Sequence, residues 1–312
     1  RYYYQVGAGA TNFADGPDCS FQTAPNTPRP TRIWAIGDSG TTGVYGDGAL
    51  YARDAYEQFT GNRPTDVWLL LGDNAYGSGT DAEYQRSFFN VYGRMLRQVA
   101  PWSTIGNHET YSSDVFGQFP YLDIFRPPTG GEAGGVPSGT RRYYSFDYGN
   151  IHFVSLDSET SDRTAAGAMA TWLRADLAAN TRDWLIAYWH SPPYTKGSHD
   201  SDNDFDTAGH LKNMREVFVP ILESNGVDVV LGGHSHNYER SYLINGHYGK
   251  SPTFASSMLK DGGSGRIGQT GAYLKPTRGP GANEGTVYAV VGSSGFATFA
   301  SGARHAAMHI QL

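Results

Sequence analysis

The chain of 312 residues is long enough for one large α/β domain or two smaller ones. Its net charge of −6 and its lack of a basic run argue against nucleic acid binding through charge. No apolar stretch reaches the ~20 residues that a membrane helix needs, so we expect no membrane contact. Cys19 is the single cysteine, which excludes an internal disulfide; scarce lysine with abundant glycine and tyrosine is typical of a secreted or periplasmic protein.

The first 30 residues differ in pattern from the rest of the chain. Residues 1–7 read as a short strand, and residues 16–30 contain four prolines, which is typical of a linker. We therefore predict an N-terminal strand and Pro-rich linker over residues 1–30, followed by one larger domain over residues 31–312.

Within the larger domain, five near-continuous apolar runs are typical of strands covered on both faces. They are residues 33–36, 67–71, 102–105, 184–189 and 229–231. Each run is followed by residues that bind cations or move protons, and these are Asp38, Asp73, Asn107, His190, His234 and His236. Because α/β sheets bind ligands beyond the carboxyl ends of their strands, we expect these side chains to meet at one edge. A single Gly-Asp turn means little, but the whole set indicates a metal site.

The other patterns in the chain predict covering helices and further strands. Helical spacing is found at residues 49–59, 81–99, 163–179 and 209–224. Hairpins are predicted for residues 142–156, and for residues 238–248 around Asn245-Gly246, while residues 287–291 and 308–312 read as late strands. This alternation indicates two packed mixed sheets with helices outside them.

The chemistry-bearing blocks also occur in a specific order. They are Gly37-Asp38-x-Gly40, Gly72-Asp73-x-x-Tyr76, Gly106-Asn107-His108-Glu109, His190 and Gly233-His234-x-His236. This order resembles the five signature blocks of the calcineurin-like metallophosphoesterases, and Tyr76 narrows the resemblance to the purple acid phosphatases. The resemblance implies a four-layer αββα sandwich of two mixed β-sheets flanked by helices, with the metal site at the strand C-terminal edge. Residues 31–312 would then form the catalytic domain.

The resemblance also implies a set of metal ligands. Asp38, Tyr76 and His236 would hold Fe(III). Asn107, His190 and His234 would hold a divalent ion (Zn, Mn or Fe), and Asp73 would bridge the two metals. The donor chemistry agrees, since phenolate and carboxylate favour a trivalent ion, whereas imidazole and amide suit a divalent one.

The implied reaction is in-line attack of a metal-bound hydroxide on a small phosphate monoester at acidic pH, with release of inorganic phosphate. His108 would protonate the leaving group or bind phosphate, and Glu109 would orient His108. His199 is a second candidate phosphate-binding residue, although the family carries a pair of histidines where this chain has His199-Asp200. Three alternatives stay open: a phosphodiesterase or nucleotide pyrophosphatase on the same site, a redox-active di-iron protein, and a phosphate-binding protein without turnover.

Overall fold

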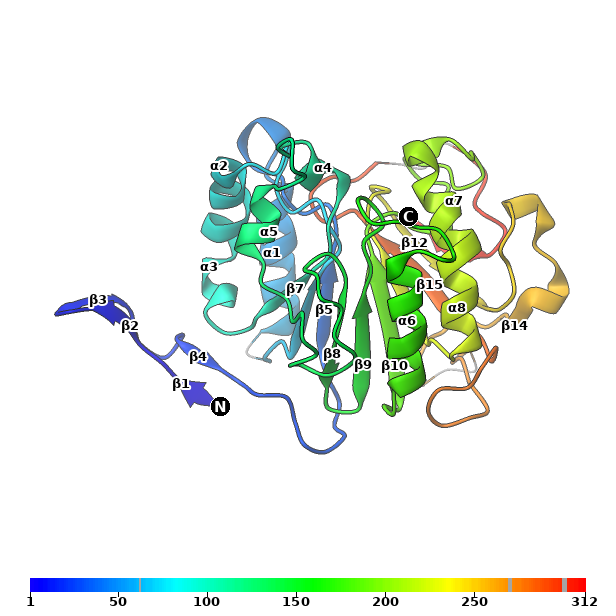
Figure 1. The fold of residues 1–312 in the computed structure, drawn as a ribbon, viewed down its shortest axis with the longest axis horizontal. Helices are drawn as coiled ribbons and strands as arrows, with labels where there is room; N and C mark the ends of the chain where they lie inside the picture. Colours follow the sequence, from blue (N-terminus) through cyan, green and yellow to red (C-terminus); the bar gives the residue numbers. More distant parts are fainter. Residues whose placement is uncertain (62, 269–270, 299–301) are drawn as a thin grey trace.

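Two β-sheets stacked face to face form the centre of the protein in the computed structural model, which describes residues 1–61, 63–268, 271–298 and 302–312 (Figure 1). The larger sheet has seven strands in the order β16-β12-β15-β11-β10-β9-β8. They are β8 Tyr144–Tyr148, β9 Ile151–Ser155, β10 Trp184–Trp189, β11 Val229–Gly232, β12 Tyr238–Ser241, β15 Val287–Val291 and β16 Met308–Gln311. The smaller sheet consists of β5 Ile33–Ile36, β6 Val67–Leu70 and β7 Pro101–Ser103.

Helices cover the outer face of each sheet. The smaller sheet is covered by α1 Gly48–Thr60, α2 Asp81–Tyr84, α3 Asn90–Leu96 and α5 Pro120–Ile124. The larger sheet is covered by α6 Ala168–Ala179, α7 His210–Asn213 and α8 Val219–Ser224. Single π-helical turns, at Gln85–Phe89 and Met214–Phe218, join α2 to α3 and α7 to α8.

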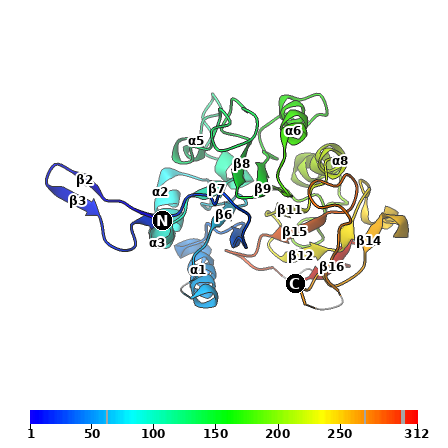
Figure 2. The ribbon, with the colours of Figure 1, turned by 90° about the horizontal axis from the view of Figure 1, so that it is seen from below.

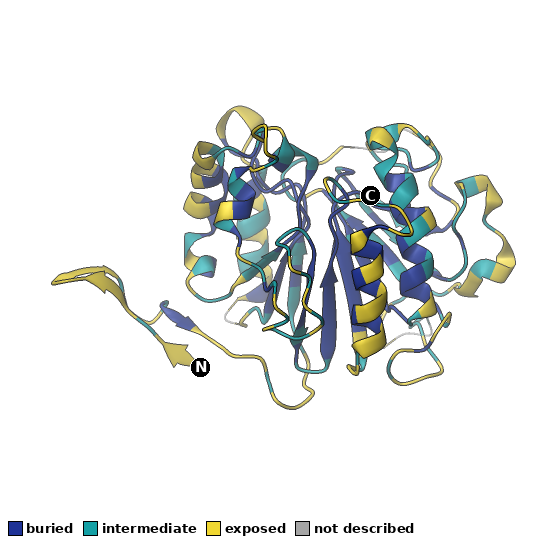
Figure 3. Ribbon diagram, viewed as in Figure 1, coloured by how far each residue is buried: buried dark blue, intermediate teal, exposed yellow. Residues whose placement is uncertain are grey.

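Three apolar layers hold these four layers of secondary structure together. Between the two sheets, Leu69, Phe153 and Tyr188 are fully buried, and Trp102 stacks on Phe146 with ring centroids 3.7 Å apart. A second layer lies under α6 and α8, and a third lies under α1, α3 and α5. Strands buried on both faces explain why the five runs are apolar rather than alternating. Figure 3 shows the consequence, with buried strands inside and exposed outer helix faces.

The predicted fold class is confirmed, although two details differ from expectation. The larger sheet is mixed, but the three strands of the smaller sheet are all parallel. The predicted hairpin around Asn245-Gly246 is wrong, because β13 Leu243–Ile244 pairs with β14 Leu259–Asp261 instead. The Gly246 amide donates to the Glu223 carboxylate at 2.7 Å, which draws the chain away from the sheet.

The N-terminal residues extend along the outside of the molecule. Here β1 Tyr2–Tyr3 pairs with β4 Ser20–Phe21, and β2 Val6–Ala8 pairs with β3 Thr11–Ala14. The β2–β3 hairpin projects away from the sandwich in both views (Figures 1 and 2). A domain division at residue 30 stays a prediction. Over the described part of the chain, no helix is both long and apolar enough to cross a membrane.

Two histidines are buried beside an arginine under the loops that follow β10 and β13. His247 and His305 are fully buried, with ring centroids 5.5 Å apart. Neither ring nitrogen of His247 has a hydrogen-bond partner among the described residues. Burial and the charge of Arg215 lower the pKa of His247 to about 4; burial and the neighbouring His247 lower that of His305 to about 3.

We predict that these histidines make the protein sensitive to acid. Their folded pKa values lie below the ordinary value of about 6.5, so the unfolded chain binds more protons as the pH falls. Their contribution is therefore retained above about pH 6.5 and lost on acidification, at about 1.4 kcal/mol per pKa unit. His247→Phe keeps an aromatic ring against Tyr194 and should lose less free energy of unfolding between pH 6.5 and 5 in urea titrations.

His152 provides the matched control for this titration. Burial would lower its pKa, but hydrogen bonds with Asp147 and Asp176 raise it to about 9. His152→Gln should therefore change the slope between pH 6.5 and 5 only slightly, because most of the linked titration of His152 lies between pH 6.5 and 9. Parallel stability curves for the wild type and His247→Phe would contradict the prediction.

Candidate metal centre

Three of the predicted ligands sit on backbone turned sharply at the strand ends. Asp38, Asp73 and His234 have φ angles of 56°, 56° and 66°, in the left-handed region that side-chain-bearing residues seldom adopt. The neighbouring glycines allow the turns to approach each other closely. A Cβ added at Gly72 would lie 2.6 Å from Nδ1 of His190, and one at Gly233 would lie 2.7 Å from Oδ2 of Asp38. The glycine that directly precedes each of these three ligands therefore reflects crowding at the site.

Asp38, Tyr76 and His236 form one group of donors. The Tyr76 hydroxyl lies 3.1 Å from Oδ1 of Asp38 and 3.3 Å from Nε2 of His236. Nε2 of His236 lies 3.4 Å from the same Asp38 oxygen. Three donor atoms therefore converge on a space that one ion could fill.

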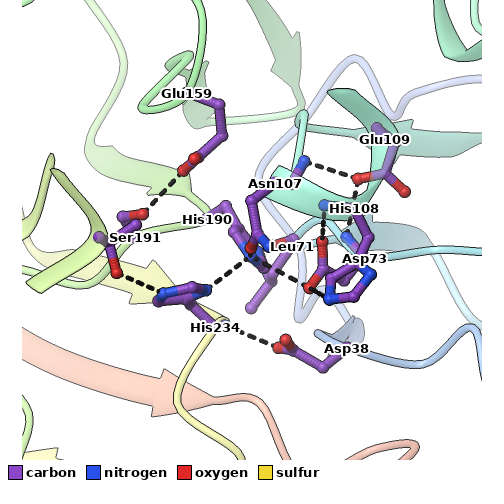
Figure 4. Close-up of polar contacts among 12 residues, drawn as sticks. Asp38, Leu71, Asp73, Asn107, His108, Glu109, Glu159, His190, Ser191 and His234 are labelled. Carbon is purple, nitrogen blue, oxygen red and sulfur yellow. Dashed lines mark hydrogen bonds and ion pairs between the residues drawn. The ribbon is translucent and has the colours of Figure 1, made fainter. Parts of the chain in front are cut away.

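Asn107, His190 and His234 form the second group (Figure 4). Nε2 of His190 lies 3.0 Å from Oδ1 of Asn107 and 3.2 Å from Nδ1 of His234. Nδ1 of His190 donates to the Leu71 carbonyl at 2.8 Å, which leaves Nε2 free as a ligand.

Asp73 connects the two groups. Its Oδ2 accepts from the Tyr76 hydroxyl at 3.1 Å and lies 3.4 Å from Nε2 of His190. Ligand atoms of Asp73, His190 and His234 all lie within 4.8 Å of one another. The structure thus brings all seven residues predicted as ligands to one edge, as α4 Asn107–Thr110 and the loops after β5, β6, β10 and β11 deliver them.

The electrostatics of this site call for cations. Burial raises the pKa of Asp38, and burial together with both aspartates raises the pKa of Tyr76 well above its usual value. Burial lowers the pKa of His234 well below its ordinary value, and the charge of His190 lowers it more. Among the described residues, Asp38 and Asp73 form ion pairs with histidines and with no lysine or arginine. Bound metal ions would stabilise the charged carboxylates and the neutral imidazoles together, so the donor set fits two of them.

The two predicted substrate-binding histidines line a cavity of about 570 Å³ above these donors. His108 donates from Nδ1 to the Gly77 carbonyl at 2.6 Å, and its Nε2 lies 4.0 Å from Oδ2 of Asp73. His199 donates from Nδ1 to Asp206 at 2.8 Å and stacks on His234 at 3.8 Å.

The expected role of Glu109 is wrong in one respect. The carbonyl of Gly77, not Glu109, holds the His108 ring. Glu109 is fully buried beneath the centre and accepts hydrogen bonds from the amides of Gly106, Asp73 and Asn74 at 2.7 to 2.9 Å. Burial and the charge of Asp73 raise the pKa of Glu109 to about 7. Hydrogen bonds to its carboxylate therefore stabilise the turns that carry two predicted ligands, Asp73 and Asn107.

Sequence reasoning missed several residues that line the cavity, and three of them, Glu159, Thr207 and His210, contact one another or a predicted ligand. The hydroxyl oxygen of Thr207 lies 2.7 Å from Nε2 of His234, and Nδ1 of His210 lies 3.0 Å from Oε2 of Glu159. Burial alone would raise the pKa of Glu159, but the hydrogen bond from His210 and the charge of His190 lower it to about 2. None of the three adjoins a recognisable block, and only contact in space marks them.

Comparison with known proteins identifies the family. Residues 31–238 match the family model described as calcineurin-like phosphoesterase. The chain belongs to this family. The match covers the five strand ends that carry the predicted ligands, so the calcineurin-like phosphoesterase resemblance deduced from them is confirmed.

Individual relatives of this phosphoesterase are purple acid phosphatases. Purple acid phosphatase 22 of Arabidopsis thaliana is 29% identical over 294 residues, which are 88% of this chain and 58% of the relative. Purple acid phosphatase 21 of the same plant is 31% identical over 292 residues, with the same coverage. The solved structure of the yellow lupin seed enzyme PPD1 matches with a TM-score of 0.67 at 20% identity, over 94% of this chain and 49% of that chain. The chain thus spans little more than half the length of these curated relatives.

We predict that Glu109→Gln weakens metal retention. An amide would place a donor against backbone N–H groups that now donate to the carboxylate, and loss of such supporting contacts typically costs ~10- to 100-fold in metal affinity. The measurement is metal content after dialysis against graded chelator. Glu132→Gln is the matched control, because Glu132 also accepts from backbone amides but lies exposed on a remote loop. Equal metal loss in both variants would contradict the role assigned to Glu109.

Proposed function

We propose that this phosphoesterase is a metal-dependent acid phosphatase, which hydrolyses small phosphate monoesters at acidic pH and releases inorganic phosphate. The observation that carries the proposal is the pair of donor groups sharing Asp73 beneath a cavity lined by His108 and His199. The cavity of about 570 Å³ suits a small phosphorylated substrate. A secreted or periplasmic location accords with the composition of the chain.

The proposed cofactors are Fe(III), held by Asp38, Tyr76 and His236, and a divalent ion, held by Asn107, His190 and His234. Anionic oxygen donors dominate the first group and neutral donors the second, which supports this order. When bound, the two ions would lower the pKa of water and neutralise charge on the phosphate oxygens, the trivalent ion more strongly.

The side chains that line the cavity above the metal donors have different proposed roles in catalysis. His108 has Nδ1 engaged with Gly77, so its Nε2 is available to give a proton to the leaving oxygen. His199 is held by Asp206 and lies against His234, where it can contact a phosphate oxygen. Asp73 orients His108 through its backbone amide, which donates to Oδ1 at 2.9 Å.

The proposal is tested by metal analysis and by turnover of matched esters. Protein never exposed to chelator should contain two metal ions per chain. It should hydrolyse aryl phosphate monoesters faster than the corresponding diesters, and should retain activity with zinc as the divalent ion, which cannot change oxidation state. One metal ion or none would refute the dinuclear centre. Faster diester turnover would favour the phosphodiesterase or pyrophosphatase alternative, and loss of activity with zinc would favour redox chemistry.

We predict that His108→Ala retains both metals but loses most phosphatase activity. Proton donors typically contribute ~10²- to 10⁴-fold to the rate. Esters with very good leaving groups should lose least, because they need little protonation. The measurement is kcat for a series of aryl phosphates of graded leaving-group pKa. An equal loss across the series would exclude proton donation by His108.

We predict that the iron-loaded protein is violet and that Tyr76→Phe bleaches it. Phenolate bound to ferric iron has a charge-transfer band in the visible spectrum, and phenylalanine has no such donor. The pH optimum should be acidic, because a trivalent ion lowers the pKa of bound water strongly. A colourless iron-loaded protein with an alkaline optimum would rule out the ferric assignment but leave the dinuclear centre standing.

A further inference from the structure

Glu159 is a buried carboxylate beside the candidate metal centre, and neither the ligand set nor the proposed proton donor makes use of it. Its side chain is 2% exposed. One oxygen accepts from the hydroxyls of Ser158 and Ser191 at 2.7 Å each, and Ser191 directly follows His190. The other oxygen accepts from Nδ1 of His210 at 3.0 Å. Glu159 is therefore tied to the strand end that carries a predicted metal ligand.

His210 is the one ion-pair partner of Glu159 among the described residues. Its Nδ1 faces Glu159, and the described residues supply no hydrogen-bond partner for its Nε2. The ring borders the same cavity as His108 and His199. The helices α4, which carries His108, and α7, which begins with His210, lie over different halves of the sandwich at the same end (Figure 1). The two histidines therefore line the cavity from different sides.

The charge at this wall matters for an anionic ligand. An unpaired carboxylate in a cavity of low dielectric repels a phosphate dianion strongly over a few ångströms. An imidazolium has an N–H at each nitrogen, so a protonated ring that donates from Nδ1 to Glu159 would also present an Nε2–H to the cavity. The Glu159–His210 pair therefore presents a donor to the cavity and offsets the carboxylate charge.

We propose that His210, positioned by Glu159, binds the phosphate oxygens of substrate and product on the wall formed by α7. The proposal rests on the proposed function, because it needs phosphate above the metal ions. Glu159 acts as a positioning residue, and its serine contacts link the wall to the strand end that bears His190.

The test measures binding of inorganic phosphate to metal-loaded protein by titration calorimetry, together with metal content. His210→Ala removes a charge-assisted hydrogen bond and leaves Glu159 unpaired, so the phosphate dissociation constant should rise roughly 10- to 100-fold. His210→Asn keeps a donor toward Glu159 without the nitrogen that faces the cavity, and should also weaken binding. Both variants should retain two metals.

The double variant His210→Ala with Glu159→Gln distinguishes a role of His210 in phosphate binding from a purely structural role. Removing the unpaired carboxylate should restore part of the affinity, so the double variant should bind phosphate more tightly than His210→Ala alone. Lys212→Ala is the control, because it deletes a nearby positive charge on α7 that pairs with Asp204 outside the cavity wall. It should change the dissociation constant less than about twofold.

Two results would overturn the proposal. One is unchanged phosphate affinity in both His210 variants, and the other is a double variant that binds no better than His210→Ala. A wild-type protein that neither binds phosphate nor hydrolyses a monoester would instead refute the proposed function. The two failures are therefore distinguishable.

Discussion

Burial of anionic oxygen at the edge of the stacked sheets is the constraint on which the site depends. Asp38 and Asp73 are almost fully shielded from water, and the Tyr76 hydroxyl lies 3.1 Å from a carboxylate oxygen of each. Such an arrangement is costly unless cations or proton donors compensate it. The histidines compensate it only in part. Burial opposes a charge on His190, but the neighbouring Asp73 raises its pKa well above the ordinary value, whereas burial and the charge of His190 lower the pKa of His234. Two metal ions would remove the conflict, which is why the donor geometry argues for a metal centre rather than a hydrogen-bonded network.

Holding these oxygens in place requires support from beneath as well as from the sides. The left-handed turns at Asp38, Asp73 and His234 would relax if their amides were free to move. Glu109 prevents this at the Asp73 turn by accepting from its amides, and Oδ2 of Asp38 accepts from the His234 amide at 2.7 Å. Hydrogen bonds thus join the Asp73 turn to the segment that bears Glu109, and the Asp38 turn to the His234 turn. The site is a hydrogen-bonded unit at one edge of an apolar sandwich.

The parts that could be predicted from sequence are those encoded by local patterns. Apolar runs marked the central strands because both faces of those strands are buried, and a glycine or a strand end marked most of the ligands because crowding excludes side chains there. Tyr76 has neither mark, and only the family resemblance indicated it. The hairpin at Asn245-Gly246 failed because a carboxylate distant in sequence, Glu223, captured the turn amide. Glu109 was recognised, but its role was misjudged, since only the folded structure reveals which amides a buried carboxylate meets. Glu159 and His210 carry no local signal, because 51 residues separate them.

The floor and the walls of the cavity are built from different kinds of segment. The floor of the cavity comes from strand ends, whose spacing is set by the sheets, and the family match over residues 31–238 includes both this floor and the wall segments. The walls come from α4, the loop after β9 and the segment leading into α7, where Thr207 and Ala208 also adopt left-handed backbone. Those segments are joined to the floor by a few side-chain contacts rather than by sheet hydrogen bonds, such as Thr207 to His234. Wall residues can therefore change with little disturbance of the metal donors. The proposed phosphate contacts of His108, His199 and His210 thus lie on the walls, whereas the proposed metal donors form the floor.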